Sequence, residues 1–214
     1  MGDVKGGKTT RRYSSAVREE SARRTRRAIT AAAAELFVAR GYDATSLADI
    51  ASAAGVARPT VFAAFGSKAA LLKWLVDQAL AGDDEPVAVA DRPWFQPVWQ
   101  AKTQRAVLDA YAEVCTLIGE RAWPLFEVVR RAADPASDVA DLWATLVANR
   151  RAGAAMVIDR LLEFGPLDDS RDRSVDALWV LNDPAHYGSL VSRCGWTAPE
   201  FRAWLSGQMA AAIL

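Results

Sequence analysis

Apolar residues recur at helical spacing along nearly the whole chain. Between residues 21 and 40 they follow the i, i+3, i+4, i+7 pattern, and Gly41 is placed to end this helix as a C-cap glycine. The alternation of apolar and polar residues that is typical of β-strands is almost absent. The periodicity therefore predicts an all-α protein.

Two short helical segments are predicted after this first helix. Ser46 is placed to cap a second helix, with Asp49 three residues on as in a capping box. Gly55 can adopt the left-handed backbone that a tight turn needs. Pro59 fits the first turn of a third helix, which Gly66 ends. This is the layout of a helix-turn-helix unit.

Aromatic residues near this unit have two interpretations. Phe37, Phe62 and Phe65 could form a stacking platform for single-stranded nucleic acid, but their helical spacing favours a place in the core. Val61, Phe62 and Phe65 are expected to anchor the third helix. Ser67 is expected to cap a fourth helix that runs to about residue 81.

The rest of the chain predicts a larger helical domain that prolines punctuate. Residues 82–97 lose the periodicity and are typical of a linker. Beyond them we expect helices at about 98–119, 121–133, 136–164, 171–182, 184–194 and 198–213. The predicted organisation is a flexible basic arm at 1–20, a helix-turn-helix domain at 21–66, a connecting helix at 67–81 and a helical domain at 82–214.

Charge is distributed unevenly although the formal net charge is zero. Residues 1–80 contain 13 Lys and Arg against 7 Asp and Glu, a net +6, and residues 81–214 contain 13 against 19, a net −6. A basic N-terminal part fits a polyanionic partner, although a solvated tail is the alternative. The arginines that could follow a phosphate backbone or enter a minor groove are Arg11, Arg12, Arg23, Arg24, Arg26 and Arg27.

Other protein classes find little support in the sequence. No stretch approaches the roughly 18 uninterrupted apolar residues of a membrane span, and no apolar secretion signal is present, so we expect a cytoplasmic protein without membrane contact. Cys115, Cys194 and the single histidine form no metal or redox motif. Without a catalytic constellation or a phosphate-binding loop, we expect no enzymatic activity, no cofactor and no metal.

Many positions between residues 21 and 75 agree in type and spacing with one known family. They are Glu35-Leu36-Phe37, Gly41-Tyr42, Thr45, Asp49-Ile50-Ala51, Ala54-Gly55-Val56, Thr60-Val61-Phe62, Phe65, Ser67-Lys68 and Leu71. Together these residues resemble the signature of the tetracycline-repressor (TetR) family. The remaining two-thirds of the chain resembles that family in its predicted helices and its length.

The resemblance implies a sequence-specific regulator of transcription that binds double-stranded DNA. It implies a homodimer whose N-terminal domains grip adjacent major grooves of a palindromic operator and whose C-terminal domain binds a small-molecule effector. Repression that the effector releases is the commoner mode. The alternative is a small-molecule-binding helical protein without sequence-specific DNA function, and a sequence-independent DNA-binding protein is a third interpretation.

The expected DNA contacts follow from this resemblance, with three departures. Ala57 stands where a serine cap is usual, Phe62 where a tyrosine is usual, and Ala64 where a histidine or tyrosine is usual. Arg58 is the first candidate for base readout, and Lys68 is expected to meet a phosphate. The full set of expected DNA-binding residues is Arg58, Thr60, Ala63, Lys68, Ser46, Arg23, Arg26 and Arg27.

The predicted helix at 136–164 places Arg150 on its apolar face. A buried arginine needs an acceptor, which could be Glu113, Glu127 or a ligand carboxylate, or Arg150 could reach past the stripe to water. The candidate effector-pocket residues are Trp99, Tyr111, Phe126, Trp143, Arg150 and Trp179.

The final helices carry more apolar surface than two amphipathic helices need for one core. We expect them to form a two-fold, four-helix dimer interface. The candidate interface residues are Tyr187, Leu190, Val191, Phe201, Trp204 and Leu205.

Overall fold

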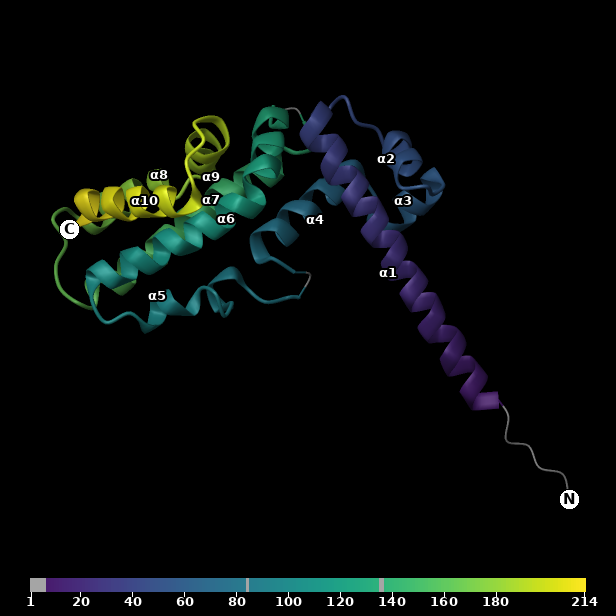
Figure 1. The fold of residues 1–214 in the computed structure, drawn as a ribbon, viewed down its shortest axis with the longest axis horizontal. Coiled ribbons are helices and arrows are strands. Elements are labelled where there is room, and N and C mark those ends of the chain that lie inside the picture. The colour runs from purple at the N-terminus through teal and green to yellow at the C-terminus, as the bar shows by residue number, and fades with distance from the viewer. Residues whose placement is uncertain (1–6, 84, 135–136) are drawn as a thin grey trace, which may run out of the picture. The chain divides into compact units, whose positions relative to one another are not determined.

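The computed structural model describes residues 7–83, 85–134 and 137–214, with the side chains of residues 7–17 and 19 outside the description. Every regular element in the described part is helical (Figure 1), which confirms the predicted fold class. The chain divides into two compact units, Met1–Leu72 and Lys73–Leu214. We call them the N-terminal and the C-terminal unit. The division falls inside helix α4 (Lys68–Ala81).

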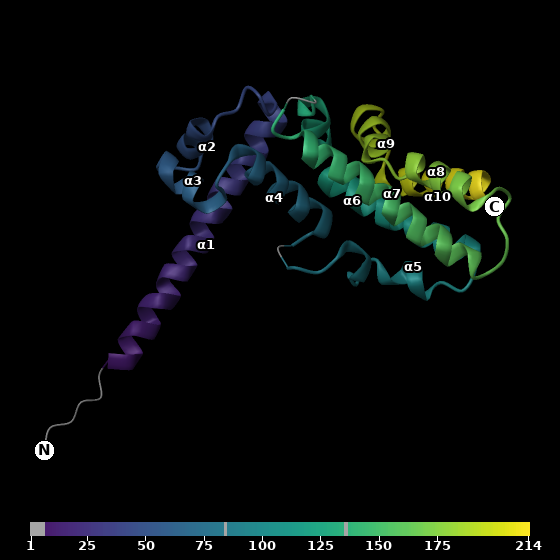
Figure 2. The same ribbon diagram turned by 180° about the vertical axis from the view of Figure 1, so that it is seen from behind.

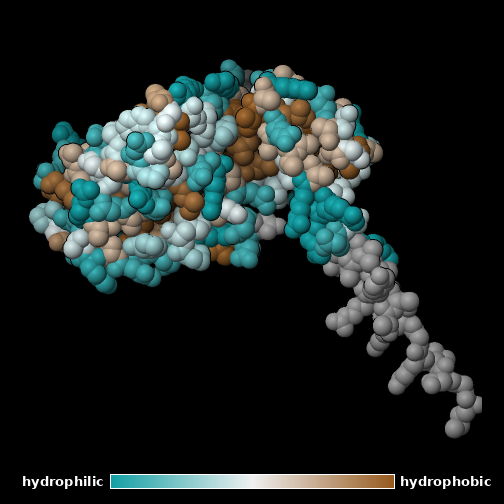
Figure 3. All heavy atoms as spheres, viewed as in Figure 1, coloured by the Kyte–Doolittle hydropathy of each residue, from teal (hydrophilic) through white to brown (hydrophobic). Residues whose placement is uncertain are grey.

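The N-terminal unit consists of α1 (Gly7–Arg40), α2 (Leu47–Ala53), α3 (Arg58–Phe65) and the start of α4. The expected start of the first helix near Ser21 is wrong, because residues 7–20 of the predicted flexible arm are helical, while residues 1–6 lie outside the described residues. This stretch contains no proline, and once a helix is nucleated each added residue gains a hydrogen bond. Where the side chains of α1 are first described, the surface of this helix is strongly hydrophilic (Figure 3).

Local signals set the ends of these helices as predicted. Ser46 and Asp49 form a reciprocal capping box at the start of α2. Gly55 has a φ of 67°, the left-handed conformation that the turn between α2 and α3 requires. Pro59 lies in the first turn of α3, and the Ser67 hydroxyl accepts a hydrogen bond from the Ala70 amide at 3.0 Å.

The core of the N-terminal unit is formed by one face of each helix. Its fully buried side chains are Ile29, Ala33, Phe37, Ile50, Val61, Leu71 and Leu72. The expected core position of Phe62 is wrong, because this side chain is 62% exposed. Neighbouring side chains on a helix point about 100° apart, so the burial of Val61 turns Phe62 outward. Phe65 is half-buried, with the Arg26 guanidinium 4.5 Å from its ring centroid.

The C-terminal unit contains the remaining helices. After the rest of α4 come the 3₁₀ turn η1 (Val89–Asp91), α5 (Gln96–Gln100), α6 (Gln104–Ala132), α7 (Ala140–Leu162), α8 (Arg171–Leu181), α9 (Pro184–Tyr187), the π-helical segment η2 (Gly188–Arg193) and α10 (Ala198–Ile213). Helix α6 is central, since it packs against α5, α7, α9 and α10. Helices α6 and α7 run alongside each other in both views (Figure 1 and Figure 2).

The prediction of two helices at 98–119 and 121–133 is wrong, because α6 runs through most of both ranges. It is one helix with Pro124 inside it, and the segment before it forms the separate short helix α5. A proline inside a helix costs about 3 kcal/mol, because it removes a hydrogen bond and clashes with the preceding turn. Burial of Ala122, Leu125 and Phe126 around Pro124 offsets this cost.

The predicted linker at 82–97 is an ordered part of the C-terminal unit. Arg92 is only 3% exposed, and it donates hydrogen bonds to the carbonyl oxygens of Val87 at 3.1 Å and Glu85 at 2.8 Å. Its guanidinium also pairs with the Asp83 carboxylate. These bonds fold residues 85–92 into a loop, which we call the 85–92 loop. Apolar periodicity cannot indicate such a loop, because one arginine holds it together.

Two other protein classes considered from the sequence were membrane-spanning and metal-binding proteins. No helix in the described part of the chain combines the length and the apolar character that crossing a membrane requires. Among the same residues, no group of three or more His, Cys, Asp or Glu side chains is placed to hold a metal ion.

Candidate functional site

Helix α3 presents a short exposed surface in the N-terminal unit. Arg58, Thr60 and Ala63 are exposed on it, as the predicted DNA contacts require. The N-cap residue Ala57 makes no side-chain hydrogen bond to the start of the helix. The start of α3 is satisfied through the backbone instead, because Pro59 has no N–H and the Thr60 amide donates to the Ala57 carbonyl oxygen at 2.9 Å.

An open groove joins this surface to the basic part of α1. Its lining residues are Arg18, Ser21, Ala22, Arg23, Thr25 and Arg26 from α1 and Thr60, Ala63 and Ala64 from α3. Two sets of residues predicted separately to contact DNA, one from each helix, thus lie on one face. Arg23 also pairs with Glu20 at 2.7 Å, and this hydrogen bond lowers the pKa of Glu20.

Lys68 and Ser46 are both engaged within the N-terminal unit. The Lys68 Nζ donates to the Tyr42 carbonyl oxygen at 2.9 Å and lies 3.9 Å from the centroid of the Tyr42 ring. An ammonium group has three N–H donors, so this position leaves Lys68 able to bind a phosphate as well. The Ser46 hydroxyl is occupied by its capping box with Asp49.

Phe62 is an exposed residue of α3 that the sequence interpretation missed. It lies between the buried Val61 and the exposed Ala63. A large apolar side chain on a polar, basic face has no packing role in the N-terminal unit. The usable signal was the helical angle, because a side chain directly after a buried one points about 100° away from it.

The C-terminal unit contains a cavity of about 410 Å³, which lies in the range of sites for small organic ligands. Its apolar lining comes from Leu80 at the end of α4, from the 85–92 loop, and from α6, α7 and the start of α9. The lining residues are Leu80, Ala88, Val89, Ala90, Phe95, Tyr111, Val114, Cys115, Ile118, Phe126, Leu146, Asn149, Arg150, Ala152, Gly153, Met156, Asn182 and Pro184.

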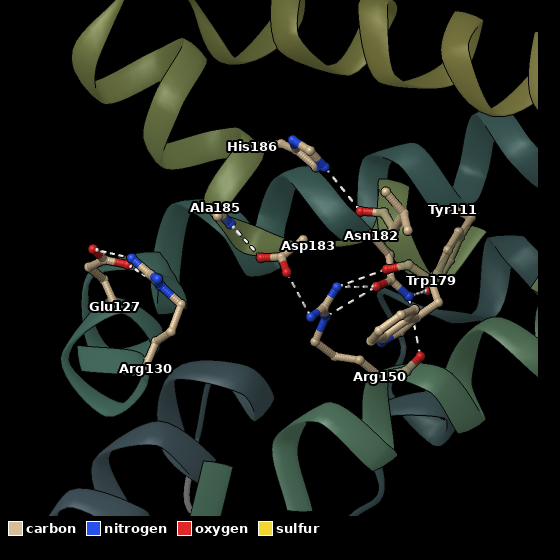
Figure 4. A network of polar contacts seen from close by, with 10 residues as sticks. Tyr111, Glu127, Arg130, Arg150, Trp179, Asn182, Asp183, Ala185 and His186 are labelled. Carbon is tan, nitrogen blue, oxygen red and sulfur yellow. Dashed lines mark hydrogen bonds and ion pairs between the residues drawn. The ribbon is translucent and has the colours of Figure 1, made fainter. Parts of the chain in front are cut away.

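Three polar residues of the lining, Tyr111, Arg150 and Asn182, belong to one network of polar contacts (Figure 4), and we call this part of the cavity its polar end. The Asn182 side-chain oxygen accepts hydrogen bonds from Arg150 Nε at 3.2 Å and Nη2 at 3.0 Å. Asn182 Nδ2 donates to the Tyr111 hydroxyl at 3.0 Å. Arg150 Nη2 also donates to the Trp179 carbonyl oxygen at 2.8 Å, and its Nη1 lies 2.8 Å from Asp183 Oδ2.

These contacts correct the expected partners of Arg150. Glu113 pairs with Arg202, and Glu127 pairs with Arg130 and Arg131. The Glu127–Arg130 pair stands apart from Arg150 (Figure 4). The acceptors of Arg150 lie in the last turn of α8 and directly after it, so they became its neighbours only when α8 packed against α7.

Burial keeps the two titratable groups beside Arg150 neutral. It raises the pKa of Tyr111 well above its ordinary range and the pKa of the Cys115 thiol to about 12. Low polarity disfavours the charged form of a phenol or a thiol. Tyr111 and Cys115 therefore act as neutral hydrogen-bonding groups at neutral pH.

Only some of the expected pocket residues line this cavity. Tyr111, Phe126 and Arg150 do so. Trp99 instead donates from its indole nitrogen to the Ala90 carbonyl at 2.8 Å, and Trp143 lines a much smaller pocket beside Glu127. Trp179 approaches the site through its backbone carbonyl. Asn182 and Asp183 are the site residues that the sequence interpretation missed, since neither belongs to a motif.

The expected dimer-interface residues separate into two groups. Tyr187, Phe201 and Leu205 are buried in the core of the C-terminal unit, so their assignment to a surface that meets a second chain is wrong. The Tyr187 and Phe201 rings pack edge to face, with centroids 5.2 Å apart. The other three, Leu190, Val191 and Trp204, are half-buried. The most buried of these apolar residues, on α9 and α10, thus pack into the core of their own chain.

A helix-turn-helix unit with a basic first helix defines a DNA-binding protein of the transcriptional-regulator class. Residues 29–75, within this unit, match the family model described as bacterial regulatory proteins, tetR family. The match covers the helix-turn-helix and the start of α4, so this part of the chain is similar to regulators of that family.

Solved structures share the fold over most of the chain. A Rhodococcus sp. protein assigned to the TetR family of transcriptional regulators has a TM-score of 0.63 at 16% identity, covering 88% of this chain and 98% of that one. A Mesorhizobium loti protein with the same assignment has a TM-score of 0.64 at 17% identity, covering 89% and 95%. The TetR regulator TylP of Streptomyces fradiae has a TM-score of 0.57 at 20% identity, covering 88% and 86%.

These identities are low enough that the likeness concerns the fold. No curated protein matches this chain in sequence.

Proposed function

We propose that this protein is a homodimeric repressor that binds a palindromic operator and leaves it when a small molecule fills the cavity of the C-terminal unit. One observation carries this proposal. Leu80, which lines the cavity, belongs to α4, and the same helix begins in the DNA-binding unit at Lys68. A ligand that displaces Leu80 therefore acts on an element that both units share.

The expected operator contacts come from two helices. Arg58 and Thr60 on α3 are exposed for base readout in the major groove, while Arg23 and Arg26 on α1 supply positive charge to phosphates. Two such units in a two-fold dimer read half-sites roughly 34–36 Å apart, or a multiple of that distance. A change in their separation weakens the fit to the operator.

The experiment compares binding to DNA from upstream of the protein's own gene with binding to random DNA of equal length, at about 150 mM salt. We expect a preference of about a thousandfold or more and a stoichiometry of two chains to one operator. Equal affinity for both DNAs with a steep salt dependence would instead identify a sequence-independent DNA-binding protein. Absence of DNA binding, with retained ligand binding, would identify a small-molecule-binding protein.

A further inference from the structure

The charges around the cavity restrict the molecules that it can take. Among the described residues that line it, Arg150 is the one with a charged side chain. Its side chain is 12% exposed, so its charge requires a partner within the protein. Asp183, which lies outside the lining, supplies that partner through its Oδ2 atom. The polar end of the cavity is therefore electrically compensated before any ligand enters.

Asp183 is also fixed in place. Its Oδ1 atom accepts a hydrogen bond from the Ala185 amide at 2.9 Å and caps the start of α9. Turning the carboxylate away from Arg150 would break this cap. An anionic ligand at Arg150 would thus either meet a second carboxylate or uncap α9. Both outcomes disfavour a negatively charged ligand.

Arg150 and Tyr111 both keep hydrogen-bond donors at this end. Arg150 uses Nε and Nη2 on Asn182 and Trp179, and Nη1 carries a second N–H beside the one that faces Asp183. The Tyr111 oxygen already accepts from Asn182, and its hydroxyl group also bonds to the weakly accepting sulfur of Cys115. A ligand oxygen could accept from the second N–H of Arg150 Nη1, and it would be a better acceptor for the Tyr111 hydroxyl than the Cys115 sulfur.

We infer that the effector is a neutral, mainly apolar molecule with a hydrogen-bond-accepting oxygen, such as a hydroxyl or an uncharged carbonyl, which lies against Arg150 and Tyr111. This inference rests on the proposed role of the cavity as the effector site. The apolar body of the ligand contacts the walls that Val114, Ile118 and Met156 form. A free carboxylate and an ammonium group both bind less tightly at the polar end, because Asp183 repels the first and Arg150 repels the second.

The test compares three probes that share one alkyl chain and differ in the charge of the head group: 1-decanol, decanoate and decylammonium. Isothermal titration calorimetry of the full chain, below the concentrations at which the probes form micelles, gives the three dissociation constants. We expect 1-decanol to bind at least about tenfold more tightly than either charged probe, because like charges at short range and unpaired buried charges are strongly unfavourable.

The variant Asp183→Asn tests the cause of this preference. The amide oxygen preserves an acceptor for the Ala185 amide, while the negative charge beside Arg150 is removed. Decanoate affinity should rise by about tenfold, and decanol affinity should change by less than about threefold. Asp176→Asn is the matched control, because Asp176 is exposed, pairs with Arg151 and lies outside the lining. It should change none of the three affinities.

The outcomes separate this inference from the proposed function. Decanoate binding to the unaltered protein as tight as decanol, or tighter, overturns the inference and leaves the cavity as an effector site. Failure of all three probes to bind a folded chain removes the effector role of the cavity, and the inference with it. Asp183→Asn binding decanoate no better than the unaltered protein overturns the assigned cause.

Discussion

The Lys68 ammonium lies against the face of the Tyr42 ring and donates to the Tyr42 carbonyl oxygen at 2.9 Å. The first residue of α4 is thereby tied to the segment that follows α1. Both residues belong to the N-terminal unit, so the contact holds the start of α4 within the DNA-binding unit. Lys68 thus has a structural role beside the phosphate contact expected from the sequence.

Replacing Lys68 with methionine should destabilise the N-terminal unit by about 1–2 kcal/mol, because a charge-assisted hydrogen bond and a cation–π contact are lost. Urea denaturation followed by circular dichroism measures the change. Lys73→Met is the control, since Lys73 is exposed and pairs with Asp77 one turn away. An unchanged unfolding midpoint for Lys68→Met would show that the contact contributes no net stability.

Replacing Arg58 with alanine should weaken operator binding by about 1–3 kcal/mol and leave the unfolding midpoint unchanged, because the side chain is exposed and positioned for base readout. Fluorescence anisotropy with specific and random DNA measures both affinities. Arg173→Ala on α8 removes the same charge from the C-terminal unit and serves as the control. An equal loss on both DNAs would assign Arg58 to a phosphate rather than to a base.

The neighbours Val61 and Phe62 should respond oppositely to alanine substitution. Val61→Ala should cost about 1–2 kcal/mol of stability, because buried methyl groups are lost, whereas Phe62→Ala should change it by less than about 0.5 kcal/mol. Phe62→Ala should instead weaken operator binding, since an exposed aromatic ring on α3 is available for contact with DNA. Unchanged DNA affinity in this variant would leave Phe62 without a role in binding.

Filling the cavity from Gly153 should imitate an effector. A Cβ atom at Gly153 would meet no other atom within 4 Å, so Gly153→Phe places a ring in the cavity without a clash at the backbone. Operator affinity should fall by about tenfold or more without any ligand. Ala144→Phe adds the same ring at an exposed position of α7 and should have no effect. Equal operator affinity for Gly153→Phe and Ala144→Phe would contradict coupling between the cavity and the DNA-binding unit.

The pair between Asp83 and Arg92 predicts a pH dependence. The hydrogen bond from Arg92 is the main cause that holds the pKa of Asp83 below its ordinary value of 3.8. Because the folded-state pKa is the lower one, the pair stabilises the C-terminal unit above pH 3.8 and loses this effect as the pH falls through the folded-state pKa. Asp83→Asn should therefore lower the urea midpoint at neutral pH and flatten its decline in acid, compared with Asp176→Asn. If the urea midpoint fell equally with decreasing pH in both variants, the Asp83–Arg92 pair would not be the cause of the pH dependence.

Interactions within a few residues of one another were predictable from the sequence. The capping box of Ser46 and Asp49, the left-handed turn at Gly55 and the helix start at Pro59 all depend on local backbone chemistry. These signals locate the helix-turn-helix unit in the sequence, directly after the helix that carries the basic residues. The sequence alone was therefore sufficient for the fold class and for the DNA-binding function.

Features that depend on distant residues were decided by the tertiary structure. Pro124 remains inside α6 because the packed core around it offsets the lost hydrogen bond. Phe62 is exposed because α3 packs with Val61 toward the core, which turns the neighbouring side chain about 100° away from it. Arg150 is compensated by Asp183, which is 33 residues away and reaches it only after α8 packs on α7. Helical periodicity records which face of each helix is apolar, but the choice of partner across a core depends on the packing of several helices at once.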